Sequence, residues 1–376
     1  LQCLNEITNF DETKKILENK KLCIKEYGNL FIVKYDKTVC DMNDPDVKKC
    51  RGLILEKNTN KLVCVPPPKS DKVEIFNNVS IEKTIYEAFI EGTMINIFKY
   101  DGQVYMATRS CIDALCHFYS NKTFNALFSE VIELSKFDSM DDNMNLSFVL
   151  QHPENTIVTQ YENPQITLVY GVTIDGENIV NYNLQHLKQI LKDKDTDMDF
   201  KIPVQYIVKS HIEVYDILNS MNHTNPGIIF KNIEYNYLRS KIWNEHYNYV
   251  RKLKGNSSSK KYMYLDLRQN NAIKEYLKYF PDDAELFEIY RLELYDTTTK
   301  LFNFYQNWKV RKNSDGMHKY QKVTEIDYEY RPLCIDLHEA FKQTKKITDK
   351  RAVINYIKNL PVAKLLFVIN YKYRSN

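Results

Sequence analysis

The sequence is poor in glycine, and this shortage excludes several classes of phosphate-binding protein. It has 376 residues but only nine glycines, whereas average usage of about 7% would give roughly 26. The nine show neither the spacing of a dinucleotide-binding fingerprint nor that of a Walker A or kinase loop, and no G-x-S-x-G elbow occurs. If this protein binds phosphate, lysine and arginine side chains must bind it.

Zinc-binding spacings and long apolar runs are also missing. Eight cysteines occur without a C-x-x-C pair or a signal peptide, which predicts reduced thiols and a cytoplasmic location. Cys111, Cys116 and His117 lie close together in the sequence, but their spacing fits no usual zinc site. No apolar run reaches 18 residues, so we expect neither a metal site nor a membrane-spanning segment.

What is present is the composition of a soluble globular protein, with 43% hydrophobic residues, 27% charged residues and a net charge of +3. The length predicts two or three domains. Tyrosine is abundant, with 28 residues. Tyrosine and lysine suit a surface that stacks on bases and neutralises phosphates, but codon bias explains the same composition. A net charge of +3 is too small to indicate a nucleic-acid partner by itself.

The first two thirds of the chain predict an α+β domain with antiparallel sheets. Asp101-Gly102 is a tight-turn signal between two apolar runs, which indicates a hairpin. Strands are predicted over 30–35, 52–56, 61–65, 93–98, 103–108, 147–158, 166–174 and 227–231, and helices over 111–128, 184–191 and 211–221.

The pattern changes after Gly255, where a polar stretch over 256–261 is typical of a linker. Apolar residues then recur at helical intervals. We predict helices over 271–279, 284–309, 336–343 and 349–371, the last broken at Pro361. The domains would be 1–255 and an all-helical C-terminal domain over 262–376.

A series of short motifs follows the chain in a recognisable order. An Arg51-Gly52 strand is followed by the proline-rich turn that ends at Lys69, then by Glu91-Gly92-Thr93 and Thr108-Arg109-Ser110. Three further blocks lie over 148–158, 227–231 and 239–253. This order resembles the phage-type RNA ligases, and most closely the ligase-like proteins of large DNA viruses. The resemblance covers roughly residues 20–270 and implies a ligase-type nucleotidyltransferase domain.

The same resemblance implies that the covalent and metal chemistry of this family is absent here. In the family, the lysine of K-x-[DE]-G attacks the α-phosphate of ATP to give a lysyl-AMP. Carboxylates of the third and fourth motifs hold the metal. In this sequence Phe89 stands at the lysine position, and Val149 and Pro226 stand at the two glutamate positions. The catalytic motifs are therefore degenerate, with no catalytic or metal residue assigned.

The phosphate-facing cations of the family are retained, with an arginine in place of the first lysine of the fifth motif. We therefore expect a viral, cytoplasmic pseudoenzyme that binds a nucleotide, such as ATP, or an RNA 5′ end or tRNA-like RNA as a binding or scaffold subunit. The predicted nucleotide- and RNA-binding residues are Arg51, Lys69, Phe89, Glu91, Arg109, Arg239 and Lys241.

A second register leaves an active enzyme open. Lys99-Tyr100-Asp101-Gly102 also matches K-x-D-G, and it would make the protein an ATP-dependent RNA ligase that uses Mg²⁺ and forms a lysyl-AMP on Lys99. Spacing argues against it, because the family has two strands between the motif glycine and the Thr-Arg-Ser position. The sixteen residues from Gly92 to Thr108 suffice for two strands, whereas the six from Gly102 suffice for one.

Two further alternatives concern partners. The basic run over 251–254 with Lys260 and Lys261 lies near several tyrosines and predicts either RNA contact or a solvated face. The apolar stripe over 286–305 indicates a helical core or a groove for a protein partner. A structural or assembly protein that binds no RNA is the remaining hypothesis.

Overall fold

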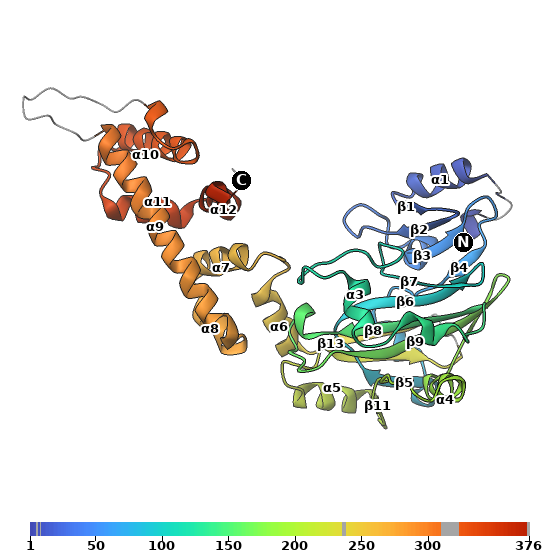
Figure 1. Cartoon of the computed structure of the whole chain (residues 1–376). Coiled ribbons are helices and arrows are strands. Elements are labelled where there is room, and N and C mark those ends of the chain that lie inside the picture. Colours follow the sequence, from blue (N-terminus) through green and yellow to red (C-terminus); the bar gives the residue numbers. More distant parts are fainter. Residues whose placement is uncertain (5–6, 8, 235–237, 310–322, 374–376) are drawn as a thin grey trace, which may run out of the picture. The chain divides into compact units, whose positions relative to one another are not determined.

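The computed structural model describes residues 1–376 except 5–6, 8, 235–237, 310–322 and 374–376. The chain divides into two compact units, Leu1–Arg251 and Lys252–Asn376. The first unit holds the β-strands and the second is helical (Figure 1). Antiparallel sheets followed by a helical region are the α+β class that the sequence predicts.

Three sheets build the first unit. The first has the order β1-β2-β3-β4, with β1 (Cys23–Tyr27), β2 (Leu30–Lys34), β3 (Arg51–Glu56) and β4 (Leu62–Cys64). The second has the order β10-β9-β8-β6-β7, with β6 (Thr93–Tyr100), β7 (Gln103–Ala107), β8 (Met144–Gln151), β9 (Gln165–Asp175) and β10 (Asn178–Asn181). The third has the order β11-β5-β12-β13, with β5 (Thr84–Ala88), β11 (Gln205–Tyr206), β12 (Gly227–Asn232) and β13 (Arg239–Trp243). Every pairing between these strands is antiparallel.

The hairpin predicted at Asp101-Gly102 is confirmed. Strands β6 and β7 pair from Tyr100↔Gln103 onward, and the two residues between them have φ angles of 51° and 74°. A left-handed backbone costs glycine little conformational energy, and aspartate tolerates it better than most residues. Lys99 is therefore a residue within a β-hairpin and not part of a loop before a strand.

Two sequence predictions in this unit are wrong. The helix predicted over 111–128 is reduced to a short segment, because Asp113 and Ala114 have positive φ angles of 62° and 52° that a right-handed helix cannot contain. The strand predicted over 147–158 ends at Gln151, since Pro153 cannot donate a ladder hydrogen bond. The helices of this unit are α1 (Phe10–Asn19), α2 (Pro45–Lys49), α3 (Phe124–Ser129), α4 (Leu184–Lys194), α5 (His211–Ser220) and most of α6 (Glu245–Lys254).

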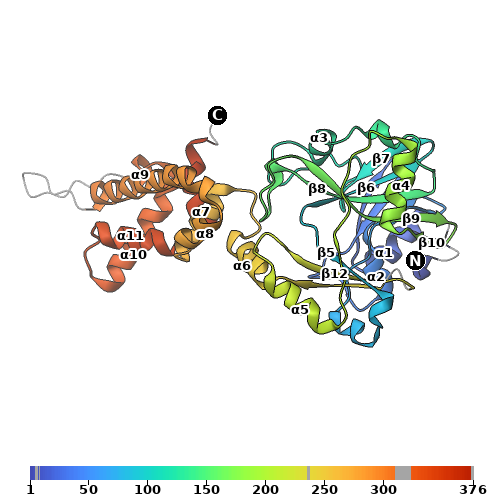
Figure 2. The same cartoon turned by 90° about the horizontal axis from the view of Figure 1, so that it is seen from below.

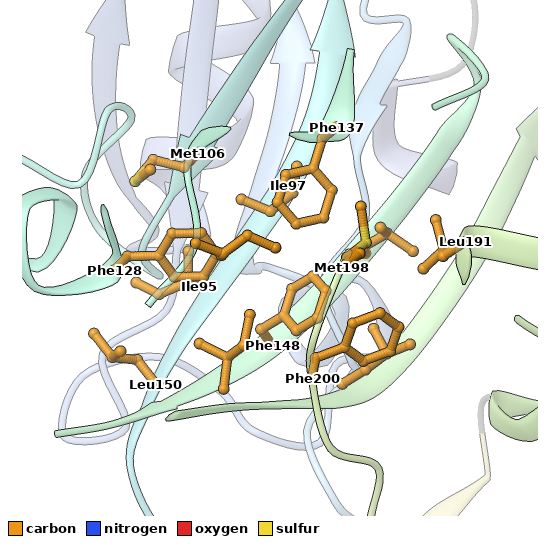
Figure 3. Close-up of a cluster of buried hydrophobic side chains, with 14 of the residues drawn as sticks. Ile95, Ile97, Met106, Phe128, Phe137, Phe148, Leu150, Leu191, Met198 and Phe200 are labelled. Carbon is orange, nitrogen blue, oxygen red and sulfur yellow. The ribbon is translucent and has the colours of Figure 1, made fainter. Parts of the chain in front are cut away.

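The central strand β8 is buried along its whole length, and its two faces differ in chemistry. The even positions Leu146, Phe148 and Leu150 pack into a large apolar core, together with Phe128 and Phe200 (Figure 3). Helices α3 and α4 contribute to that core. The opposite face is polar although it is also buried, with Asn96, Asn145, Ser147, Gln151 and Thr167.

Apolar packing also covers the outer faces of the other two sheets. Helix α1 supplies Leu17 to a cluster with Phe31 and Leu55 of the first sheet. Helix α5 runs beside β12 (Figure 2) and packs Val214 and Leu218 against the third sheet. Helices cover these outer faces. The polar face of the second sheet and the face of the third sheet that α5 does not cover therefore remain available for a binding site.

The second unit is built on one long helix, whose predicted bounds of 284–309 are confirmed. It consists of α7 (Lys260–Gln269), α8 (Ile273–Tyr279), α9 (Ala284–Lys309), α10 (Arg331–Thr344), α11 (Lys350–Asn359) and α12 (Val362–Asn370). Helix α9 packs against α7, α10, α11 and α12. The break predicted at Pro361 separates α11 from α12, which are bent by 114°. Among the described residues no single helix is long and apolar enough to cross a membrane, although this bent pair has the length and composition to do so.

We predict that Phe148→Ala lowers the free energy of unfolding by about 3–5 kcal/mol, because it leaves a cavity in the core beneath β8. Urea denaturation followed by circular dichroism measures the change. Ile179→Ala, at an exposed position, is the control and should stay within about 0.5 kcal/mol of the native protein. Equal effects of the two substitutions would contradict this placement of the core.

Candidate anion-binding site

The uncovered face of the third sheet collects several predicted site residues in adjacent strands. Lys241 lies opposite Ile229 of β12, which lies opposite Glu87 of β5. One end of this face carries Trp243 opposite Gly227, and the backbone N–H of Phe89 donates to the Gly227 carbonyl at 2.9 Å. Strand pairing therefore places Phe89, Lys241 and Trp243 side by side, although about 150 residues separate the first from the other two.

Lys241 lies between two aromatic rings. Its Nζ is 4.8 Å from the ring centroid of Phe89 and 4.5 Å from that of Trp243. Trp243 in turn stacks on Tyr247 at 5.7 Å and has the guanidinium of Arg251 at 5.0 Å. Such cation–π contacts stabilise a charged group that is partly removed from water. The result is a surface on which aromatic rings and cations alternate.

Positive charges crowd this surface. Burial and the neighbouring Arg51, Lys37, Arg239 and Arg251 lower the pKa of Lys241 to about 8. Burial lowers the pKa of Lys37 as well, with contributions from Lys69, Arg51, Arg109 and Arg251. Among the described residues, no member of this group forms an ion pair with a carboxylate. The group consists of Lys37, Arg51, Lys69, Arg109, Arg239, Lys241 and Arg251. We call these seven residues the cation cluster.

The proline-rich turn is tied to β13, which brings Lys69 into the cluster. The N–H of Asp71 donates to the Arg239 carbonyl at 2.8 Å, and the Ser240 hydroxyl donates to the Asp71 carbonyl at 2.7 Å. Arg51 Nη1 donates to the carbonyl of Pro67 at 3.4 Å. These bonds connect the first sheet, the turn and the third sheet at one place.

Gly52 allows Arg51 and Arg109 to come together. A Cβ atom at position 52 would lie 2.8 Å from the Cα of Arg109, and Gly52 has a φ of +92°. A side chain there would collide with backbone, which cannot yield as a flexible side chain could. The glycine of the Arg-Gly motif is thus needed for the close approach of two motif segments.

Glu91 has a structural role in the site. Its carboxylate accepts hydrogen bonds from the N–H groups of Val158 and Thr159 at 2.9 and 3.1 Å, and from the Thr159 hydroxyl at 3.2 Å. Burial and its hydrogen bond to Glu91 raise the pKa of the Tyr247 hydroxyl. The sequence predicts Glu91 as a ligand-binding residue, and the structure shows it holding the segment after β8 next to the aromatic surface.

Val149 and Pro226, which the motif alignment places at the family's two glutamate positions, are apolar and buried. Val149 is buried against the backbone at Gly92, where a Cβ would lie 2.7 Å from Val149 Cγ1. Pro226 is buried, and its carbonyl accepts from the Asn244 N–H at 2.9 Å. Among the residues that the structure describes, no group of three or more His, Cys, Asp or Glu side chains could hold a metal ion.

Lys99 lies apart from the cation cluster. Its Nζ is 3.5 Å from the carboxylate of Asp142. It lines a cavity of about 620 Å³ together with Glu56, Lys61 and Asp101, and no member of the cation cluster lines that cavity. The alternative nucleophile therefore has a carboxylate partner and mixed charges around it.

Several residues of the site were missed at the level of sequence. Trp243 lies within the fifth motif, and its i,i+4 spacing to Tyr247 across a helix start was the available signal. Tyr247 was noted only as one of the tyrosines near the basic run. Arg251 was noted only as part of a basic run. Lys37 lies in a loop after β2 and carries no motif signal at all.

The chain was compared with known families, curated proteins and solved structures. No protein-family model matches the chain. Over 187 residues it is 27% identical to a protein of Autographa californica nuclear polyhedrosis virus described as "Putative bifunctional polynucleotide kinase/RNA ligase". The match covers 44% of this chain and 27% of that relative, so the chain spans little more than a quarter of its length.

Solved RNA ligases align with the chain as well. An archaeal ATP-dependent RNA ligase aligns over 99% of this chain and 79% of its own, with a TM-score of 0.47 and 10% identity. An RNA ligase of Naegleria gruberi, solved with pyrophosphate, aligns over 50% of this chain and 58% of its own, with a TM-score of 0.40 and 11% identity. The match to the viral protein and the order of the motifs together support an RNA-ligase-like family for this chain.

We predict that Glu91→Ala lowers the free energy of unfolding by about 2–3 kcal/mol, because it leaves the buried N–H of Val158 and its neighbour without acceptors. Chemical denaturation measures the loss. Glu162→Ala removes an exposed carboxylate from the same segment and is the matched control. Native-like stability of Glu91→Ala would show that the carboxylate does not hold this segment.

Proposed function

We propose that this protein is a catalytically degenerate RNA-ligase-like protein that binds a nucleotide or an RNA 5′ end at the cation cluster. The observation that carries the proposal is a group of seven cations without a carboxylate partner among the described residues, beside the rings of Phe89 and Trp243. Repulsion between such cations is relieved when a polyanion binds. The half-buried rings of Phe89 and Trp243 suit a base or ribose next to the phosphates.

The side chains at the motif positions favour binding without covalent catalysis. An aromatic ring occupies the position of the family's nucleophile, and Val149 and Pro226 offer no oxygen from a side chain to a metal. The protein would therefore act as a binding or scaffold subunit in the cytoplasm, or in a viral factory if it is viral. An active ligase that uses Lys99 has less support, because Lys99 pairs with Asp142 away from the cluster.

The helical unit supports RNA over a free nucleotide as the partner. Residues 252–376 contain 24 lysines and arginines and 15 aspartates and glutamates, a net charge of +9. The whole chain has only +3, so residues 1–251 carry net negative charge outside the cation cluster. A strongly basic helical unit favours a long polyanion.

We predict that the affinity for a 5′-triphosphorylated RNA oligonucleotide falls as the pH rises above 8. Lys241, with a pKa lowered to about 8, loses its proton in that range, and an ammonium that has lost its charge no longer attracts phosphate. The loss should approach about tenfold per pH unit for one proton. Fluorescence anisotropy between pH 6.5 and 9.5 measures the dissociation constant.

Lys241→Met should bind more weakly at pH 7 and lose this pH dependence, whereas Lys99→Met should behave like the native protein. The same proteins incubated with α-labelled ATP and Mg²⁺ should show no covalent adduct on a denaturing gel. An adduct that disappears in Lys99→Met would overturn the binding-only proposal in favour of a ligase.

The basic helical unit predicts a steep salt dependence. Replacing the exposed Lys346, Arg351 and Lys358 by glutamine should reduce the slope of log affinity against log salt for a single-stranded RNA of about 30 nucleotides. Each lost phosphate contact is worth about 0.7 of slope. The matched control replaces Lys15, Lys21 and Lys61, which are exposed on the first unit. Equal slopes for the two triple variants would remove the helical unit from the RNA interface.

A further inference from the structure

Arg239 differs from the other members of the cation cluster because it is buried and incompletely bonded. Only 8% of its surface is exposed. Its Nε and Nη1 atoms have no hydrogen-bond partner among the described residues. Two orphaned donors on one buried guanidinium are unusual, because buried polar atoms are nearly always paired.

The guanidinium lines a small cavity between the third and the second sheet. The cavity has a volume of about 60 Å³. Its wall includes Glu87 and Lys231 on the side of the third sheet and Tyr170 and Asn181 on the side of the second sheet. It lies at the opposite end of the sheet face from Phe89 and Trp243, because Arg239 pairs with Lys231 and Trp243 with Gly227.

The charges around this cavity do not balance. Glu87 is the acidic residue that lines the cavity, and its carboxylate forms an ion pair with the Nζ of Lys231, which also donates to the Val169 carbonyl at 3.0 Å. Arg239 forms no direct ion pair and shares the attraction of Glu87 with Lys231, while Arg51 adds a further positive charge nearby. Burial and Arg51 lower the pKa of Arg239 to about 10, so the group is still charged at neutral pH.

Water alone does not solve this imbalance. A water molecule in the cavity could accept from the two orphaned nitrogens. It would not balance the surplus of positive charge, because Glu87 is the one carboxylate facing Lys231, Arg239 and Arg51 in these contacts. An anion would satisfy both needs. Tyr170, whose pKa burial raises to about 12, keeps its proton at neutral pH and presents a hydroxyl donor at the same cavity.

We propose that the cavity between the second and third sheets is a binding site for one small inorganic anion, held by Nε and Nη1 of Arg239 with Tyr170 and Asn181 as further donors. The volume admits an anion of the size of a halide or a single phosphate group and excludes a nucleotide. The anion is either a free ion or one phosphate of the ligand at the cation cluster. This site does not depend on the larger ligand being RNA.

The test is thermal unfolding of the full chain in sodium chloride or sodium bromide against sodium gluconate at constant ionic strength. Halide should raise the Tm of the native protein by about 2–4 °C with saturation, as expected for a ligand that binds the folded state. Arg239→Met should lose this response. Arg109→Met, which removes an exposed cation from the cluster, should keep it. An equal response in the native protein and Arg239→Met would overturn the proposal.

A bromide-soaked crystal of the native protein gives an independent answer that no folding defect of a variant can obscure. An anomalous peak in the cavity within about 3.5 Å of the Arg239 guanidinium is expected for a bound anion, and an empty cavity would overturn the proposal. Adding saturating ATP separates the two sources of the anion. Loss of the halide response means that a phosphate of the nucleotide takes the site, and a retained response means that the ion is free. A failure of RNA binding with a retained halide response would count only against the proposed function.

Discussion

The site depends on cations that are held together without a carboxylate to balance them. Arg51, Arg239 and Lys241 come from two different sheets. Arg51 lowers the pKa values of both Arg239 and Lys241, and Arg239 also lowers that of Lys241. Electrostatic repulsion would separate these three side chains if the backbone did not hold them close to one another. Antiparallel pairing of β12 with β5 and β13, and the bonds between Asp71 and β13, supply that constraint.

The apolar cores cover the outer faces of the sheets, so the charged side chains lie on the inner faces. The outer faces of the sheets are covered by α1, α3, α4 and α5, so hydrophobic burial supplies the free energy that offsets the repulsion. The inner face of β8 is buried but polar, with Ser147 donating to Asn96 at 2.8 Å. A buried polar face beside a cationic face is an environment that accepts a charged ligand and would not arise from packing alone.

Motifs with strong local signals were predicted well. The hairpin at Asp101-Gly102 and the long helix α9 follow from turn chemistry and helical periodicity over many residues. The short loop after β7 was predicted as a helix, because apolar spacing does not reveal that Asp113 and Ala114 have left-handed backbones. The membership of Lys37 and Arg251 in the cation cluster was equally hidden, since proximity across three segments leaves no trace in residue spacing.

The sequence by itself determined the α+β class of the chain and the side chains at the motif positions. Residue identity alone decides that Phe89, Val149 and Pro226 carry neither an amine nor a carboxylate. Tertiary structure alone decided how the retained cations differ. Lys241 lies between aromatic rings, while Arg239, two residues away, lines a small cavity and has two donors without a hydrogen-bond partner among the described residues. Burial and the distances between charges set these properties, and both are fixed only when the sheets pack.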